Sequence, residues 1–215
     1  MSTTIAFDRA RYDGYIFDMD GTLVDSMPSH LRAWKEAIVK FGGDPAKFTE
    51  EYYYAKAGQP TRSIMAEFER DFGWDWPVDE ATHYKDERAK AHLGDVTVIQ
   101  PVMEVVRSLP DRPKAVASGN FQDTVELTLR TVGIRDEFTY IIGSDRVPRG
   151  KPHPDLFLNA AEGLGVAPER CLVFEDGVPG MKAAEAAGMD WIDVRPFYLH
   201  DDHPSRLHVH TNHPD

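Results

Sequence analysis

The chain has 215 residues, 41% of them hydrophobic and 11% aromatic, which is enough to bury the core of one large domain or of one domain with a sizeable insertion. Its 24 Lys and Arg residues against 36 Asp and Glu residues give a formal net charge of -12, which argues against binding to nucleic acid or to an anionic membrane. One cysteine excludes an intramolecular disulfide, and with no signal-peptide pattern and no apolar run near the roughly 18 residues of a membrane span, we expect a cytoplasmic monomer.

Strand-like and helix-like segments alternate at both ends of the chain. Short apolar runs predict strands at residues 14–17, 114–117, 140–143, 171–174 and 190–194. Between them, apolar periodicity predicts helices at about residues 102–109, 122–132, 154–164 and 178–187. C-terminal caps are expected at Gly133, Gly165 and Gly188, and the lone Cys171 is expected to be a buried structural thiol. This alternation predicts an α/β fold with a parallel sheet flanked by helices.

The segment from residue 28 to residue 93 differs from the rest of the chain. It contains no convincing strand, but helical patterns occur at residues 30–41, 61–72 and 78–92, with aromatic residues throughout. We interpret it as a small helical cap domain inserted after the first strand, with hinges near residues 26–28 and 93–95. The α/β core domain is then discontinuous and comprises residues 1–27 and 94–199.

A histidine-rich tail ends the chain at residues 200–215. It holds five histidines, several aspartates and few apolar residues, which favours a solvated or disordered segment. Metal chelation, at His208 and His210 in particular, is the alternative, although the spacing of the histidines matches no defined metal site.

Two carboxylates stand where the first predicted strand ends. Asp18 and Asp20 follow the apolar residues 15–17 and precede Gly21. Ligands bind at the carboxyl ends of strands in open α/β sheets, and side chains two residues apart can face the same site. One carboxylate can then attack a substrate while the other moves a proton, if a cation reduces their repulsion. An EF-hand is excluded, because its fifth, sixth and twelfth positions are here Thr22, Leu23 and Ser29.

A second candidate element follows the strand predicted at residues 114–117. Ser118 stands at the carboxyl end of that strand, where its hydroxyl can donate to a phosphate oxygen, and Gly119 lets the backbone N–H approach. Asn120 could add a further contact. Because a strand ending in Ser-Gly is common, this pattern indicates a phosphate grip only together with the other motifs.

Lys151 is the candidate for the positive charge that phosphoryl transfer needs near the phosphate oxygens. Its context is not a P-loop, because Asp145 stands where that motif has its first glycine and Pro152 replaces the hydroxyl residue after the lysine. Instead, Pro152 keeps Lys151 on an extended loop, since the residue before a proline avoids the helical conformation. The alternative is an exposed loop lysine.

A further buried strand ends in carboxylates, at Glu175 and Asp176, and is again followed by a glycine. Carboxylate oxygens are the ligands that Mg²⁺ favours in proteins. Alternatively, Asp176 caps the helix that follows it, and both roles are compatible.

In this order, the motifs resemble those of the haloacid dehalogenase-like (HAD) hydrolase superfamily over about residues 14–195. The resemblance implies a Rossmann-like core, a nucleophile at Asp18 and an acid/base group at Asp20. It also implies an Mg²⁺ site built from the Asp18 side chain, the Asp20 backbone carbonyl and the Asp176 side chain, with Glu175 bound directly or through water. True haloacid dehalogenases lack an acidic residue at the position of Asp20, so phosphate esters rather than carbon–halogen bonds are the expected substrates.

Within the superfamily, the chain is most similar to the β-phosphoglucomutase-like branch with its small helical cap. The stretch from Phe174 through residues 186–190 to Arg195 looks like that of bacterial sugar phosphatases that act on fructose 1-phosphate and 6-phosphogluconate. We therefore expect an Mg²⁺-dependent phosphatase that hydrolyses a small phosphorylated metabolite, a sugar phosphate, through an aspartyl-phosphate intermediate.

The cap is expected to select the substrate. His30 occupies the position of a cap-hinge histidine in the mutases, although a packed or exposed histidine fits equally well. A second cap segment offers further candidates for substrate binding: Lys56, Gly58, Gln59, Thr61 and Arg62. Lys85 and Arg88 are better explained as solvated helix charges than as site residues. The tryptophans of this region are expected to pack inside the cap: Trp34, Trp74 and Trp76.

Two other functions stay open. A β-phosphoglucomutase-type isomerase would use the same core, but the mutases carry an arginine three residues after a cap glycine, whereas here Thr61 stands three after Gly58 and Arg62 comes one later. On a helix, one residue is a rotation of about 100 degrees, which favours the phosphatase. A non-catalytic phosphate-binding protein is the other alternative, but it would be expected to lack Asp18 or Asp20.

Overall fold

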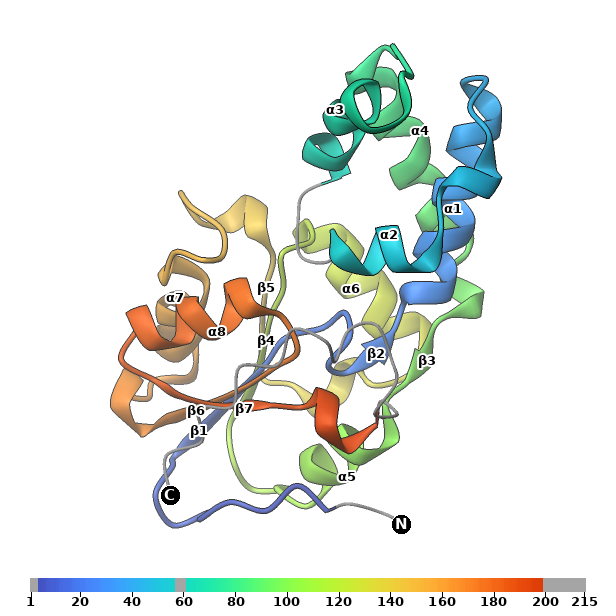
Figure 1. Ribbon diagram of the computed structural model, residues 1–215. Helices are drawn as coiled ribbons and strands as arrows, with labels where there is room; N and C mark the ends of the chain where they lie inside the picture. Colours follow the sequence, from blue (N-terminus) through green and yellow to red (C-terminus); the bar gives the residue numbers. More distant parts are fainter. Residues whose placement is uncertain (1–3, 57–60, 199–215) are drawn as a thin grey trace.

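A five-stranded sheet forms the centre of the fold (Figure 1). The computed structural model describes residues 4–56 and 61–198, and all strand pairings in this sheet are parallel. The order across the sheet is β5 (Tyr140–Ile142), β4 (Lys114–Ala117), β1 (Gly14–Phe17), β6 (Cys171–Glu175) and β7 (Asp190–Asp193). The predicted α/β fold with a parallel sheet is confirmed, and each predicted strand boundary lies within one residue of the observed one.

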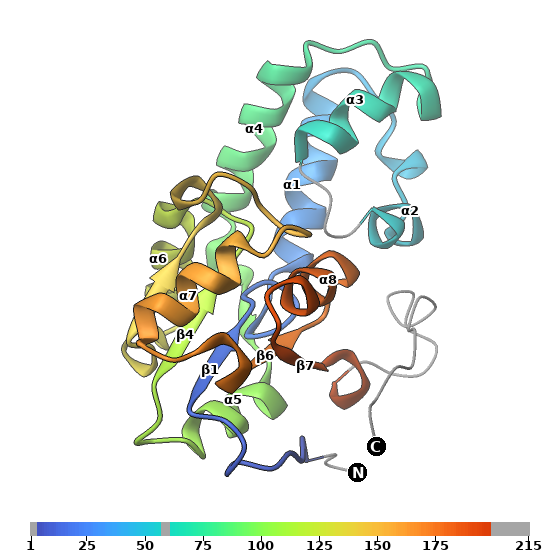
Figure 2. The ribbon, with the colours of Figure 1, turned by 90° about the vertical axis from the view of Figure 1, so that its left-hand side faces the viewer.

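Helices bury both faces of the sheet, because successive side chains of each strand point to opposite faces. Tyr15 and Phe17 of β1 pack in one apolar cluster with residues of α5 (Gln100–Arg107) and α6 (Gln122–Thr131). Ile16 belongs to the cluster on the other face, which includes residues of α7 (Asp155–Leu164) and α8 (Val178–Ala186). In Figure 2, α7 lies in front of the sheet. Cys171 is fully buried in this second cluster, as predicted.

A helical insertion, residues 27–95, lies beyond the carboxyl end of β1 (Figures 1 and 2). Its helices are α1 (Met27–Lys40), α2 (Glu50–Ala55), α3 (Thr61–Phe72) and α4 (Val78–Ala91). The insertion has an apolar cluster of its own, in which Trp34 and Phe68 are buried and the rings of Trp74 and Trp76 stack at 5.0 Å. The expected packing role of the tryptophans is confirmed. Helix α2 was not predicted; the N–H of Tyr52 in its first turn donates to the Thr49 hydroxyl.

A small antiparallel sheet stands where the chain enters and leaves the insertion. It consists of β2 (Val24–Asp25) and β3 (Thr97–Val98), with Val24 opposite Val98 and Asp25 opposite Thr97. Hinges but no strands were predicted near these positions, because two residues are too few to show a periodic pattern.

The remaining regular elements are short 3-10 helices, at Pro45–Lys47, Leu93–Asp95, Arg135–Glu137, Ser144–Arg146, Pro168–Arg170 and Arg195–Phe197. Among the residues with described structure, no helix combines the length and apolar character needed to cross a membrane. The histidine-rich tail predicted at residues 200–215 lies outside the described residues.

Candidate active site

Adjacent strands bring the predicted motifs to one end of the sheet. Asp18 follows β1, Ser118 follows β4, and Glu175 ends β6, and these strands are neighbours in the order β4-β1-β6. The N–H of Asp18 donates to the Phe174 carbonyl at 3.0 Å, which fixes the end of β1 against the end of β6. The site is therefore built by the parallel register of the sheet.

Lys151 connects the nucleophile candidate to the acidic end of β6. Its ammonium contacts the Asp18 carboxylate and lies 2.7 Å from Oε1 of Glu175, and its Nζ stands 5.0 Å from the centre of the Phe157 ring. Burial alone would lower the pKa of Lys151, but the two carboxylates raise it above its ordinary value. The lysine is therefore a fixed positive charge rather than an exposed loop residue.

Three carboxylates converge beside this lysine. Oxygens of Asp18, Glu175 and Asp176 lie within 4.8 Å of one another. Burial, together with the neighbouring Glu175 and Asp20, raises the pKa of Asp18 to about 7 although Lys151 opposes this shift. Burial and the charges of Glu175 and Asp18 raise the pKa of Asp176 well above its ordinary value. The single positive charge of Lys151 does not compensate the negative charge of three carboxylates. A donor set made only of oxygen atoms fits a hard divalent cation.

Two glycines lie so close to these carboxylates that the site has no space for a side chain at either position. At Gly21, which has a φ of +77°, a Cβ would stand 2.2 Å from Oδ2 of Asp176. At Gly180, a Cβ would stand 1.6 Å from Oε1 of Glu175. Any side chain at either position would therefore displace an acidic group of the site.

Asp176 does not cap the following helix. The N-cap of α8 is Gly177, without a side-chain cap, and Oδ1 of Asp176 instead accepts from the Thr22 hydroxyl at 3.1 Å. It is Glu175 whose Oε2 accepts the Gly177 N–H, at 2.5 Å. The capping alternative of the sequence analysis is thus wrong, and Asp176 faces the nucleophile loop.

Asp20 has polar partners different from those of Asp18. Its carboxylate accepts from the Ser26 hydroxyl and from the Asn120 amide, both at 2.5 Å, and Nε2 of His30 lies 3.9 Å away. Burial alone would raise the pKa of Asp20, but His30, Ser26 and the charge of Lys85 together lower it. Sequence reasoning missed Ser26 and assigned Asn120 to phosphate; in the structure Asn120 binds the Asp20 carboxylate.

His30 is linked in turn to a buried lysine. Nζ of Lys85 lies 3.0 Å from Nδ1 of His30 and 3.3 Å from both the Thr61 hydroxyl and Oδ1 of Asp86. Only 3% of Lys85 is exposed, and burial lowers its pKa. The expectation of a solvated Lys85 was therefore wrong. The charges along residues 78–92 gave no sign of which one points inward. Arg88 pairs instead with Glu36.

A local hydrogen bond shapes the turn after β4. Ser118 is buried, and its Oγ accepts the Asn120 N–H at 3.1 Å. A Cβ at Gly119 would meet no protein atom within 4 Å, so packing within the protein does not require this glycine.

The other predicted cap residues lie among acidic partners. Lys56 pairs with Glu67 and lies 3.6 Å from Asp71, and Nε of Arg62 lies 2.7 Å from Asp79. The charges of both are thus matched within the helical insertion. Gly58 and Gln59 lie outside the described residues.

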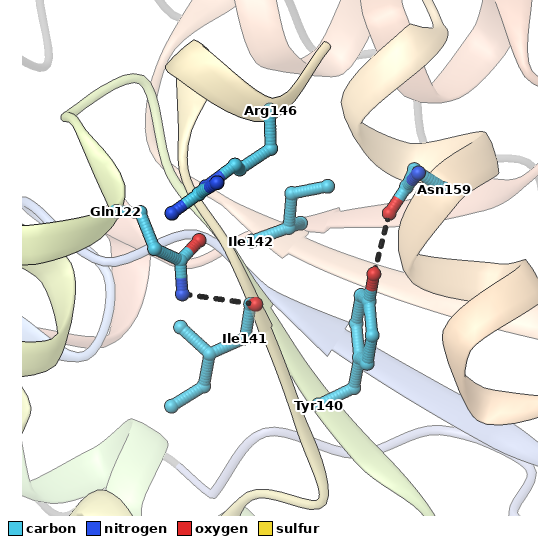
Figure 3. A pocket seen from close by; sticks show the side chains of 6 residues that line it. All are labelled: Gln122, Tyr140, Ile141, Ile142, Arg146 and Asn159. Carbon is cyan, nitrogen blue, oxygen red and sulfur yellow. Dashed lines mark hydrogen bonds between the residues drawn. The ribbon is translucent and has the colours of Figure 1, made fainter.

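A separate hollow of about 330 Å³ lies beside the edge strand β5, between α6 and α7 (Figure 3). It is lined by Gln122, Tyr140, Ile141, Ile142, Arg146 and Asn159. Two of its polar side chains bond to each other: Tyr140 donates its hydroxyl to Oδ1 of Asn159 at 2.8 Å. None of the residues predicted for catalysis or metal binding lines this hollow.

Comparison with known proteins agrees with the geometry. A model of the haloacid dehalogenase-like hydrolase family matches residues 12–188. Fructose-1-phosphate phosphatase YqaB from Escherichia coli is 37% identical over 186 residues, which cover 86% of this chain and 97% of that protein. CbbY from Rhodobacter sphaeroides, solved in complex with phosphate, superimposes with a TM-score of 0.71 at 26% identity, covering 84% of each chain.

A putative β-phosphoglucomutase from Thermotoga maritima superimposes with a TM-score of 0.67 at 26% identity, covering 82% of each chain. The predicted resemblance is confirmed both to sugar phosphatases, by the sequence comparison, and to the β-phosphoglucomutase-like branch, by the structural comparison. The chain belongs to the haloacid dehalogenase-like hydrolase family.

Proposed function

We propose that this chain is an Mg²⁺-dependent phosphatase that hydrolyses a small phosphorylated metabolite, a sugar phosphate, with Asp18 as the nucleophile. The observation that carries the proposal is the pair of carboxylates after β1. Asp18 stands between Lys151 and the acidic cluster, while Asp20 has a separate set of hydrogen-bond donors. The similarity to a fructose-1-phosphate phosphatase over nearly its whole length supports a sugar phosphate as substrate.

The metal would be held by the Asp18 side chain, the Asp20 backbone carbonyl and the Asp176 side chain. When bound, Mg²⁺ supplies positive charge that lets an anionic phosphate approach a carboxylate. Because Glu175 already contacts Lys151 at 2.7 Å and the Gly177 N–H at 2.5 Å, we assign it chiefly to holding the lysine, with any metal contact made through water.

In the proposed reaction, the Asp18 carboxylate attacks phosphorus in line and forms an aspartyl-phosphate. Lys151 neutralises charge on the transferring group, and Ser118 and the Gly119 N–H hold its oxygens. Asp20 gives a proton to the leaving sugar oxygen and then takes one from the water that hydrolyses the intermediate. The first step needs Asp20 in its protonated form, whereas His30, Ser26 and the charge of Lys85 lower the pKa of Asp20 in the ligand-free protein.

The helical insertion is proposed to act as the cap of this site. We assign the core to residues 1–27 and 94–199 and the cap to residues 28–93, with the β2–β3 pair between them. The contact between Lys85 and His30, and the position of His30 3.9 Å from Asp20, give the cap a charged link to the acid/base group. Cap and core would thus be coupled at the residue that moves the proton.

A mutase is the second candidate, favoured by the structural likeness to a putative β-phosphoglucomutase. It requires a cap group that binds a second phosphate. Arg62 is the sequence candidate, but it stands one residue beyond the position at which the mutases carry their arginine, which favours hydrolysis over isomerisation. A non-catalytic phosphate-binding role is disfavoured by the complete catalytic set around Asp18.

The proposal is tested by measuring phosphate release from a panel of phosphorylated sugars and sugar acids, with Mg²⁺ and with EDTA. β-Glucose 1-phosphate is included with a trace of the bisphosphate, and glucose 6-phosphate is assayed as a product. Release that requires Mg²⁺ and is abolished by Asp18→Asn is the expected result. Isomerisation with little release would establish the mutase, and no turnover of any ester would favour the binding protein.

A further inference from the structure

The segment after β7 returns to the nucleophile loop. Tyr198, which follows the 3-10 helix Arg195–Phe197, donates its hydroxyl to the backbone carbonyl of Gly21. These residues are 177 positions apart in sequence, and Gly21 directly follows Asp20. No step of the proposed mechanism uses Tyr198, so this contact needs an explanation of its own.

The hydrogen bond fixes one of two peptide groups that set the shape of the loop. The Gly21 N–H donates to the Val24 carbonyl at 2.8 Å, and in a trans peptide the N–H and C=O point in opposite directions. The Asp20 carbonyl is therefore turned away from Val24. The next peptide is held at its N–H by Met19, through a bond of 3.3 Å from Thr22, and at its carbonyl by Tyr198.

The segment that carries Tyr198 is itself anchored beside the acidic cluster. The Val194 N–H donates to the Glu175 carbonyl at 3.0 Å. The buried Arg195 guanidinium binds both oxygens of the Asp193 carboxylate, at 2.9 and 2.7 Å. Tyr198 thus reaches Gly21 from a support tied to the strand that ends in Glu175.

We propose that Tyr198 is a positioning residue for the metal site. Its hydroxyl holds the Gly21–Thr22 peptide, and this keeps the Asp20 carbonyl turned away from Val24 and the Thr22 hydroxyl on Asp176, so that the Asp20 carbonyl and the Asp176 carboxylate would be in place to hold the cation. The inference rests on the Mg²⁺ site of the proposed function and adds to it a residue outside the family motifs.

The test is Mg²⁺ titration by calorimetry, without substrate, of the wild-type protein and of Tyr198→Phe. The substitution removes one hydroxyl and keeps the ring. Loss of one hydrogen bond predicts roughly three- to tenfold weaker Mg²⁺ binding. In steady-state kinetics, the Mg²⁺ concentration for half-maximal activity should rise by the same factor, while kcat at saturating Mg²⁺ stays close to the wild-type value.

Tyr140→Phe is the matched control, because it also removes a tyrosine hydroxyl bonded to one acceptor, here Oδ1 of Asn159 at the separate hollow (Figure 3). It should bind Mg²⁺ as the wild type does. Equal Mg²⁺ affinity of Tyr198→Phe and wild type would overturn the inference, and so would equal weakening in both variants. A wild type that binds no Mg²⁺ would instead overturn the proposed function itself.

Discussion

Asp18 and Asp20 are identical side chains two residues apart, yet their surroundings move their pKa values in opposite directions. Burial and neighbouring carboxylates raise the pKa of Asp18 to about 7, while His30, Ser26 and Lys85 outweigh burial and lower that of Asp20. A divalent cation bound at Asp18 would lower its pKa again and favour the ionised form that a nucleophile needs. The different partners of the two carboxylates make their roles separable by experiment.

Asp18→Asn should abolish turnover of every phosphate ester, because the nucleophile is lost. Asp20→Asn should lose roughly 10²- to 10⁴-fold in kcat/KM for a sugar phosphate, whose leaving oxygen needs a proton. It should lose much less for p-nitrophenyl phosphate, whose leaving group departs as an anion. Steady-state kinetics on both esters check this, and equal losses on the two substrates would contradict the acid role of Asp20.

Burial raises the pKa of the Cys171 thiol to about 11. Because the folded pKa lies above the ordinary value of about 9, burial of the neutral thiol contributes its full stability below pH 9, and this contribution is lost as the pH rises toward 11. At pH 9, we expect very slow reaction with a disulfide reagent in the folded protein and complete reaction in urea. Rapid labelling of the folded protein at pH 9 would show that the thiol is exposed.

Sequence reasoning reached the residues that follow strands and the loop residue Lys151, but it missed the roles of Lys85 and Tyr198. Asp18, Ser118 and Glu175 stand where apolar runs end, a position that the pattern itself marks. Lys85 enters from a helix whose charged residues look alike in sequence, and Tyr198 arrives from the far end of the chain. Their partners are set by tertiary packing, which no local pattern encodes.

At the scale of elements, the predictable parts are those with strong periodicity or punctuation. The strands of the large sheet and α3 were placed closely, and the predicted caps Gly133, Gly165 and Gly188 all have positive φ. The misses are the two-residue strands β2 and β3 and the short helix α2. These elements are too short for a hydrophobic period and depend on contacts distant in sequence.

The close approach of α8 to the end of β6 leads to an element-scale prediction. Gly180→Ala should raise helix propensity yet lower activity, because its Cβ would stand 1.6 Å from Oε1 of Glu175, the partner of Lys151. We expect a loss of roughly 10²-fold in kcat/KM, the scale of a displaced catalytic group. Gly94→Ala is the control, since its Cβ would meet nothing within 4 Å. Unchanged activity of Gly180→Ala would contradict the packing described.

On the scale of the whole molecule, the helical insertion has an apolar cluster distinct from the clusters that cover the sheet. Phe68 lies at its centre, with ring contacts to Trp34, Trp74 and Trp76 at 5.4 to 5.5 Å. These are three of the chain's four tryptophans. Tryptophan fluorescence therefore reports mainly on the packing of the insertion.

Phe68→Ala should destabilise the insertion by about 3–5 kcal/mol, the usual cost of deleting a buried phenyl group. In a urea titration, tryptophan fluorescence should change at lower urea than in the wild type, while far-UV circular dichroism retains the signal of the α/β core. A fluorescence transition at the wild-type urea concentration would contradict the central position of Phe68.

The proposed mechanism depends above all on a covalent bond between Asp18 and phosphorus, and trapping the phosphorylated enzyme in acid tests that bond most directly. The enzyme is mixed with Mg²⁺ and ³²P-labelled fructose 1-phosphate, or the best ester of the panel, quenched in acid within the first turnovers and digested at low pH. We expect ³²P on the peptide that contains Asp18 in the wild-type protein, and no labelled peptide from the Asp18→Asn variant. Label on another residue, or turnover in Asp18→Asn, would contradict this mechanism.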